Sequence, residues 1–350
     1  MTVTVNAVTV NAAIETALLE VLRAETGQPD LGYAEQPVPL TGGFWADLLA
    51  FSLANPPPGW PTDLVARVMP DAGVARKETI VQAAVSGAGF PTPAVRACGG
   101  QESRLGRAFM IMDRARGAPL LPGLEGAAAL PAGLRRAGQV PDVLASAMAA
   151  LHALDPGPVR EQLITIDGVP VTLAGQLDAL REAAVRCQRD DLAGAARWLT
   201  DHLGRPEAPE VICHGDLHPF NVLVDGSRVA VLDWSTCLLA PRAYDVAFTA
   251  LILSEPPLLL PAWLRPAVRL VGRLLARRFI RRYEMHAAAA VDREAVRWHQ
   301  AVAALRALTE VASWVHEGTI GDRAGHPWLA SGPAFAGCVT AVTGVAVRPR

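Results

Sequence analysis

The sequence predicts an α+β fold in two lobes, a small antiparallel β-sheet lobe with one main helix and a larger, mostly helical lobe. Three observations lead to this prediction. At 350 residues, the chain is longer than one typical hydrophobic core supports. Short strand patterns surround one helical pattern in residues 1–116, whereas helical periodicity dominates residues 117–350. One strand pair, expected within residues 221–233, interrupts the helical lobe.

The first lobe is expected to begin with a helix over residues 12–26, because Ile14, Leu18 and Leu22 recur at helical spacing and Gly27 follows. Its main helix is expected over 74–87. Strands are expected at residues 36–41, 45–53, 63–69, 94–98 and 107–112. Together these elements predict a compact antiparallel sheet that holds one main helix.

The second lobe contains long segments with helical periodicity. Helices are expected at residues 141–154, 172–187, 190–202, 261–283 and 292–316. Residues 122–139 are rich in Ala, Gly and Pro and are interpreted as a loop with short helices. The tail over 318–350 is punctuated by Gly and Pro and carries one apolar patch.

Composition excludes several classes of partner. The formal net charge of −2 gives no electrostatic reason to bind nucleic acid or an anionic membrane. The five cysteines are odd in number and widely spaced, with no CxxC pair, which argues against a disulfide framework or zinc site and fits a reducing cytoplasm. The N-terminus lacks the pattern of a signal peptide. We therefore expect a cytoplasmic monomer or homodimer.

The stretch 211–234 is the most informative part of the chain. Two runs of β-branched residues flank Asp225-Gly226, which predicts a tight hairpin. Asn221 and Asp233 are symmetric about Ser227, so a hairpin would bring them together at its open end, roughly 5 Å apart. These two side chains and Asp216 supply hard oxygen ligands. Such a set suits Mg²⁺ that carries a phosphate.

The segment His214-Gly215-Asp216-Leu217-His218-Pro219-Phe220-Asn221 resembles the catalytic loop of the aminoglycoside phosphotransferase and choline kinase family, small-molecule relatives of the protein kinases. It has the kinase spacing of His, Asp two residues later and Asn seven residues later. Asp233 stands in Leu232-Asp233-Trp234, where protein kinases have Asp-Phe-Gly. Residues 241–247, with Asp245, resemble the next family element.

This resemblance implies a protein kinase-like fold and a phosphotransferase that uses ATP or GTP with Mg²⁺. Asp216 would accept or orient the proton of the attacking hydroxyl, as phosphoryl transfer requires positioning more than covalent chemistry. Asn221 and Asp233 would hold Mg²⁺. His214 and Asp245 would support the catalytic loop.

The nucleotide would bind mainly to the first lobe. Gly42 and Gly43 occupy the place of the glycine-rich phosphate cover. Arg67 stands where the family usually has lysine, a departure that some phosphotransferases share, and Glu78 would be its ion-pair partner. Lys77, the only lysine in the chain, is the less favoured alternative. Backbone groups near Met112, Asp113 and Arg114 would bind the base.

Two alternatives to a small-molecule kinase stay open. A metal-dependent phosphohydrolase could use His214, Asp216 and His218 as ligands. A non-catalytic nucleotide-binding relative is the other, since Arg67 departs from the usual pattern. The acceptor is a hydroxylated small molecule and stays open among an aminoglycoside, a macrolide and a metabolite. Its pocket is expected among the helices after residue 258, with Trp298, Glu310, Trp314 and Glu317 as candidate lining residues.

Overall fold

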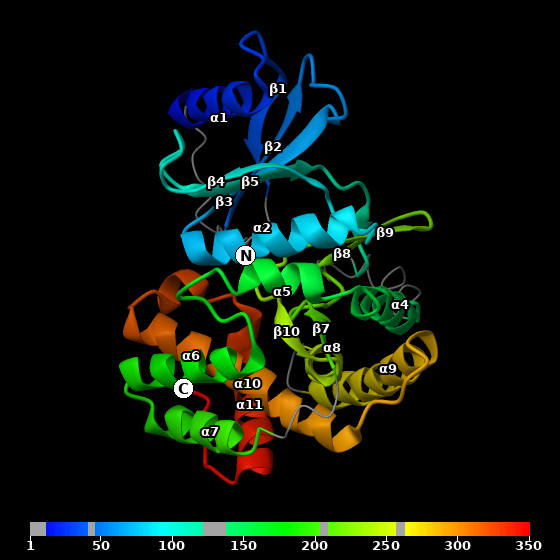
Figure 1. Cartoon of the computed structure of the whole chain (residues 1–350). Helices are drawn as coiled ribbons and strands as arrows, with labels where there is room; N and C mark the ends of the chain where they lie inside the picture. The colour runs from blue at the N-terminus through cyan, green and yellow to red at the C-terminus, as the bar shows by residue number, and fades with distance from the viewer. Residues whose placement is uncertain (1–11, 41–45, 122–137, 204–208, 257–262) are drawn as a thin grey trace. The chain divides into compact units, whose positions relative to one another are not determined.

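The computed structural model describes residues 12–40, 46–121, 138–203, 209–256 and 263–350 (Figure 1). Two compact units divide the chain. The first comprises residues up to 117 with segments 158–169 and 223–235, and the second comprises 118–157, 170–222 and 236–350. The units differ from the predicted lobes because the two inserted segments group with the first unit.

The first unit contains a five-stranded antiparallel sheet with strand order β1-β2-β3-β5-β4. Helices α1 and α2 lie on its two faces (Figure 1). Leu18 and Leu22 of α1 pack on one face, and Ala75 of α2 packs on the other. The elements are α1 (Ala12–Thr26), β1 (Tyr33–Pro39), β2 (Asp47–Leu53), β3 (Asp63–Met69), α2 (Ala72–Gly87), β4 (Val95–Gly99) and β5 (Ala108–Asp113).

Strand β3 shows how the sequence positions the site. Side chains alternate between the two faces of a strand. Leu64, Ala66 and Val68 therefore enter the core shared with α1, while Met69 enters the core shared with α2. Arg67 has the same parity as Met69 and so faces α2. The start of α2 is fixed by its N-cap residue, Asp71, whose side chain accepts a hydrogen bond from the Val74 amide in the first turn.

A hairpin joins β8 (Val222–Asp225) to β9 (Arg228–Val231). The predicted turn Asp225-Gly226 is corrected by one residue, because Asp225 ends β8 and the turn is Gly226-Ser227. Gly226 has a φ of 59°, a conformation that glycine adopts readily at the first position of a two-residue turn.

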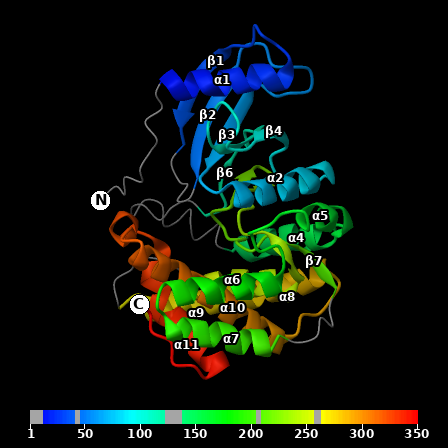
Figure 2. The same cartoon turned by 60° about the vertical axis from the view of Figure 1, so that its left-hand side comes forward.

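The second unit is mostly helical, and its core is built around α10, which contacts α6, α7, α8 and α11 (Figure 2). No helix in the described ranges has the length and apolar character needed to cross a membrane. The elements of this unit are β6 (Ala118–Pro119), α4 (Val140–His152), α6 (Leu173–Arg186), α7 (Asp190–Asp201), β7 (Glu210–Cys213), β10 (Leu238–Pro241), α8 (Ala243–Ser254), α9 (Arg265–His286), α10 (Arg293–His316), the 3₁₀ turn η2 (Ile320–Arg323) and α11 (Pro327–Thr343). The remaining helix, α5 (Gly157–Leu163), groups mainly with the first unit.

Two helices of the second unit go beyond the sequence prediction. The tail contains α11, which starts with Pro327 and ends before Gly344 at a φ of 71°. Proline is tolerated in the first turn and glycine is favoured just after the last, so the two residues mark the helix ends. Helix α8 is buried along almost its whole length and therefore lacks an amphipathic pattern.

Candidate active site

Three charged residues of the first unit form one connected group. Arg67 Nε lies 3.0 Å from Glu78 Oε1, and Arg67 Nη2 donates to Asp233 Oδ1 over 3.0 Å. Arg67 is 5% exposed and Glu78 is fully buried, whereas the Asp233 side chain retains 35% exposure. The structure thus brings together the sequence-predicted Arg67 and Glu78. Arg67 extends from this buried pair to a carboxylate that solvent reaches.

Burial lowers the pKa of the Arg67 guanidinium, but Glu78 and Asp233 outweigh it and the net pKa is raised. Burial also raises the pKa of Glu78, with Arg67 opposing and Asp233 adding to the effect. Arg67 is therefore a permanent cation held in place by a buried acid. A fixed guanidinium of this kind can bind phosphate oxygens through two parallel hydrogen bonds.

The backbone at Asp233 adopts a φ of 66°, in the left-handed region that non-glycine residues rarely occupy. Its neighbours hold it there. Ser235 Oγ donates to Asp233 Oδ1 over 2.8 Å, and the buried Trp234 donates from Nε1 to Thr92 Oγ1 over 3.0 Å. Such a conformation persists only where the surroundings fix it, and it is typical of functional sites. Asp233 Oδ2 has no hydrogen-bond partner in the part of the chain that the structure describes.

The other nucleotide-site predictions have different outcomes. Gly42 and Gly43 lie outside the described residues. At the end of β5, the Asp113 and Arg114 amides donate to the carbonyl oxygens of Ala94 and Asp63 and are not available to a base. The Asp113 carboxylate pairs with Arg96. A base contact at Met112 to Arg114 would therefore use backbone groups other than these two amides. The Lys77 side chain is buried within α2.

In the second unit, Asp216 lies in the loop after β7 and both of its oxygens are engaged. Oδ1 lies 3.3 Å from Arg306 Nη2, and Oδ2 lies 3.3 Å from Asn221 Nδ2 and 3.4 Å from His218 Nε2. The side chain retains 22% exposure. Burial raises the pKa of Asp216, but His218, Arg306 and His214 together hold it below its usual value. Asp216 is therefore an ionised carboxylate that solvent reaches.

Asp245 contacts the backbone of the loop that contains Asp216, where the resemblance implies a supporting carboxylate. Its Oδ2 accepts from the His214 amide over 2.7 Å, and its Oδ1 accepts from the Gly215 amide over 2.6 Å. His152 Nε2 lies 3.2 Å from Oδ2, and His152 Nδ1 lies 2.7 Å from Tyr283 Oη. A buried network thus fixes the loop backbone through one carboxylate.

This network is relevant to the alternative in which the protein is a metal-dependent phosphohydrolase. Within the described ranges, three metal-ligating side chains come within 4.8 Å of one another at His152, Cys213 and Asp245, whereas the HGDLH segment does not bring three such side chains together. Both oxygens of Asp245 already accept backbone hydrogen bonds. This grouping is therefore explained by support of the loop, and the geometry does not favour a histidine-rich metal centre at Asp216.

Arg306 of α10 is a site residue that the sequence prediction missed. Its Nη1 donates to Gly215 O over 2.9 Å, in addition to its contact with Asp216. Its guanidinium lies over the rings of Phe248 and Trp328, at 5.0 and 5.8 Å from their centroids. The sequence feature that could have indicated this role is a single arginine within the otherwise apolar helical run 301–308. A buried charge is rare without a partner.

A model of the phosphotransferase enzyme family matches residues 54–272, more than half of the chain. The chain belongs to this family. An aminoglycoside 3′-phosphotransferase of Streptomyces fradiae is 35% identical over 117 residues, which cover 30% of this chain and 38% of that protein. The matched stretch thus spans less than two thirds of the curated relative.

Solved structures of phosphotransferases share the fold. A candidate aminoglycoside phosphotransferase of Ralstonia eutropha JMP134 superposes with a TM-score of 0.63 at 19% identity, covering 95% of this chain and 97% of that one. A thermostable APH(4)-Ia bound to AMP-PNP and hygromycin B gives 0.58 at 20% identity, covering 94% and 98%. Macrolide 2′-phosphotransferase type I gives 0.54 at 17% identity, covering 93% and 98%.

These matches confirm two predictions. The α+β, kinase-like fold of the small-molecule phosphotransferases is the fold of this chain. The predicted membership in the phosphotransferase family is confirmed by the family model.

Proposed function

We propose that this protein transfers the γ-phosphate of ATP or GTP to a hydroxyl group of a small molecule with the help of Mg²⁺. The observation that carries the proposal is the ionised Asp216, whose loop is fixed by Asp245 and whose carboxylate is oriented by Arg306 and Asn221. The AMP-PNP bound by the related APH(4)-Ia supports a nucleotide triphosphate as donor.

In this function Asp216 orients the acceptor hydroxyl and accepts its proton as the new bond to phosphorus forms. Arg67 binds phosphate oxygens of the donor and stabilises the charge on the transferring group. Both groups already have charged or polar partners before any substrate arrives. Such preorganisation lowers the barrier because little rearrangement is needed during reaction.

The residues proposed for Mg²⁺ fit that ion. Asn221 Nδ2 donates to Asp216 O and Oδ2, and Asn221 Oδ1 has no partner among the residues that the structure describes. An amide oxygen such as Asn221 Oδ1 and a carboxylate oxygen such as Asp233 Oδ2 are both hard ligands of the kind that Mg²⁺ prefers. When bound, Mg²⁺ would neutralise charge on the donor phosphates.

Asp233→Ala is expected to abolish the Mg²⁺-dependent part of nucleotide binding, because it removes the carboxylate proposed to hold the ion. Titration of the nucleotide with and without Mg²⁺ measures the effect. Asp225→Ala, an exposed carboxylate in the same hairpin, is the matched control and should bind as the wild type does. Equal Mg²⁺ dependence in Asp233→Ala and wild type would contradict the proposed ligand.

Arg306→Met is expected to lower kcat about tenfold or more, since a hydrogen bond to a charged group contributes ~1.5–3 kcal/mol. Because Arg306 is one of the groups that lower the pKa of Asp216, its loss should also move the acid limb of the kcat/KM profile to higher pH. Arg306→Lys retains the charge and should leave this limb nearer its original position. An unchanged profile in Arg306→Met would show that the contact does not tune the base.

The direct test is a panel of hydroxylated acceptors, each incubated with ATP or GTP and Mg²⁺ and scored by release of nucleoside diphosphate. Acceptor-dependent release supports the proposal and identifies the donor. Nucleotide binding without release would favour the non-catalytic relative, and phosphate-ester hydrolysis without nucleotide would favour the hydrolase.

None of the five cysteines, all of which the structure describes, forms a disulfide, which supports our proposal of a reducing cytoplasm.

A further inference from the structure

Helix α9 carries a local concentration of positive charge. Its 22 residues contain seven arginines and one acidic residue, Glu284. The whole chain, in contrast, has a formal net charge of −2, so its overall balance conceals this basic segment. Basic helices on protein surfaces are typical of segments that meet an anionic partner.

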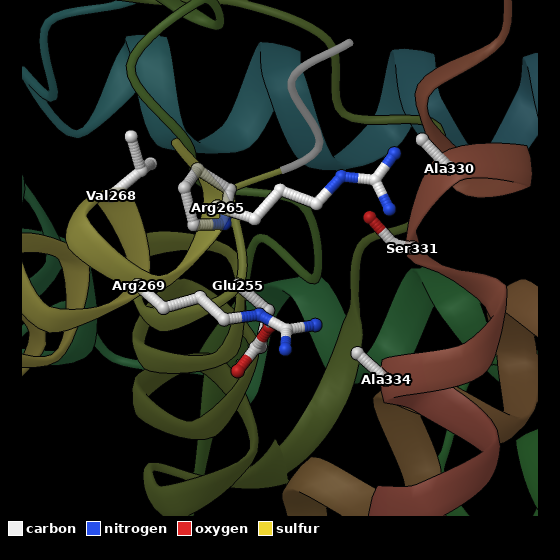
Figure 3. A pocket seen from close by; sticks show the side chains of 8 residues that line it. Glu255, Arg265, Val268, Arg269, Ala330, Ser331 and Ala334 are labelled. Atoms are coloured by element: carbon white, nitrogen blue, oxygen red, sulfur yellow. The ribbon is translucent and has the colours of Figure 1, made fainter. Parts of the chain in front are cut away.

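Part of this charge is neutralised within the second unit. Arg269 Nε lies 2.6 Å from Glu255 Oε2 (Figure 3), and Arg273 Nη2 lies 3.9 Å from Glu255 Oε1. Arg282 pairs with Asp142 of α4. These ion pairs join α9 to α4 and to the residue that follows α8, so their arginines serve the fold.

Three arginines in the middle of α9 have no carboxylate to pair with. Arg277, Arg278 and Arg281 are exposed, and none of them forms an ion pair with a residue that the structure describes. The Arg281 side chain donates to the Arg277 carbonyl of its own helix. Because a guanidinium is not deprotonated in proteins, three positive charges reach solvent within little more than one helical turn.

Large apolar side chains lie beside these arginines. Leu270, Val271 and Leu274 are 61%, 53% and 55% exposed. Positions 270, 274, 277 and 281 follow the alternating four- and three-residue spacing of one helix face. We define the basic apolar ridge by its exposed residues, which are Leu270, Val271, Leu274, Arg277, Arg278 and Arg281.

The opposite face of α9 is fixed in the fold. Gly272, Ala276, Phe279 and Tyr283 are buried, where α9 packs on α4 and α8 (Figure 1). A Cβ atom at Gly272 would lie 2.3 Å from the Leu253 carbonyl oxygen, so α9 approaches α8 closely there. A partner that encloses a whole helix would therefore have to pull α9 out of the unit. A partner with a flat surface needs only the ridge.

We propose that the basic apolar ridge binds the surface of a lipid bilayer that contains anionic lipids. The unpaired guanidinium groups contact phosphate oxygens of the headgroups, and the leucines enter the boundary between headgroups and acyl chains. Contiguous exposed apolar side chains are typical of such a contact. The binding is peripheral, because α9 stays packed in the second unit.

Charge complementarity favours a lipid surface over a second copy of this chain. The ridge contains no acidic residue, so two ridges that faced each other would bring both sets of unpaired arginines together. An anionic bilayer presents negative charge to the whole ridge, and each basic residue near it raises the affinity about fivefold. Such binding is independent of the proposed phosphotransfer and can be measured without nucleotide or acceptor.

The test measures co-sedimentation of the full chain with vesicles, made either of phosphatidylcholine alone or of equal parts of phosphatidylcholine and phosphatidylglycerol. Wild-type protein should bind the mixed vesicles, with an affinity that falls as salt is added, and should bind the neutral vesicles much more weakly. Combined replacement of the three ridge arginines, Arg277→Gln, Arg278→Gln and Arg281→Gln, should lower the affinity for mixed vesicles by about a hundredfold.

Two further variants separate the ridge from general charge. Combined replacement of three exposed arginines outside α9, Arg186→Gln, Arg197→Gln and Arg228→Gln, removes the same charge and should leave the affinity close to that of wild type. Leu270→Asn combined with Leu274→Asn should lower the affinity about tenfold, since two leucines no longer enter the apolar boundary. All of these side chains are exposed, so thermal unfolding should match that of wild type in every variant.

Four results would overturn the proposal. These are no binding to the mixed vesicles, an equal loss in the α9 arginine variant and its control, full binding by the leucine variant, and binding to soluble polyglutamate as tight as that to the vesicles. The last result would assign the ridge to an acidic protein. Light scattering without vesicles tests the remaining occupant, because a dimer that the leucine variant converts to a monomer would assign the ridge to a second copy of the chain and contradict lipid binding.

Discussion

Replacing Asp216 with Asn is expected to reduce phosphoryl transfer by about 10²–10⁴-fold, the range of a general-base contribution. The amide keeps the shape of the carboxylate but can neither accept the hydroxyl proton nor provide the negative charge that faces Arg306. Nucleotide affinity should stay nearly intact, because Arg67, Glu78 and Asp233 lie in the other compact unit. Single-turnover transfer and nucleotide titration measure the two quantities separately.

A control is needed because Asp216 accepts several contacts that also order its loop. Asp201→Asn, an exposed acid at the end of α7, should transfer phosphate at the wild-type rate. Thermal unfolding of Asp216→Asn should show a folded protein, since Asp245 and His152 hold the loop backbone independently. Wild-type activity in folded Asp216→Asn would remove Asp216 from the chemistry.

The pH dependence follows from the sign of the pKa shift. The pKa of Asp216 is held below its usual value of 3.8, so the carboxylate is already ionised throughout the neutral range. Its protonation should limit activity only as the pH falls through that lowered pKa. The same sign applies to the buried Asp245, whose pKa is also lowered. Its contribution to stability is present above the unfolded-state pKa and is lost as the pH falls through the folded-state pKa.

Local patterns in the sequence predict the first unit well. Strand β3 occupies the predicted residues 63–69, because alternation of apolar side chains is a local property of the chain. The same alternation turns Arg67 toward α2, where Glu78 meets it. The contact of Asp233 with Arg67 joins residues 166 apart in sequence, and only the resemblance to kinases places both in one site.

Residues that act from buried helices are harder to predict. Arg306 reaches Asp216 across 90 residues of sequence, and no motif connects the two. Helix α10 is buried on most sides, so hydrophobic periodicity does not show which face meets the catalytic loop. The sequence around His152 indicates only a residue packed in a helix, yet its ring contacts both Asp245 and Tyr283. Such roles depend on tertiary contacts that a single sequence does not specify.

The second large effect is on stability and concerns Arg67, which stands where the family usually has lysine. Arg67→Met should destabilise the folded protein by about 3–5 kcal/mol, the cost of leaving one member of a buried ion pair without its partner. The buried Glu78 is that partner, and Arg67 is the group that most opposes the rise of its pKa. Burial already raises the pKa of Glu78 to about 7, so without Arg67 this pKa is expected to rise further and Glu78 to be protonated at neutral pH. Urea unfolding at several pH values measures both the loss and its pH dependence.

A second variant separates structure from phosphate binding. Arg67→Met combined with Glu78→Leu replaces the buried pair with apolar side chains and should recover most of the lost stability, as such replacements are often neutral or stabilising. Nucleotide affinity should stay low, because the guanidinium proposed to bind phosphate is still absent. Arg67→Lys should retain part of the affinity, since an ammonium group binds phosphate as a point charge without the bidentate geometry. Wild-type nucleotide affinity in the double variant would contradict a role of Arg67 in phosphate binding. Arg67 would then serve only to stabilise the core of the first unit and to contact Asp233.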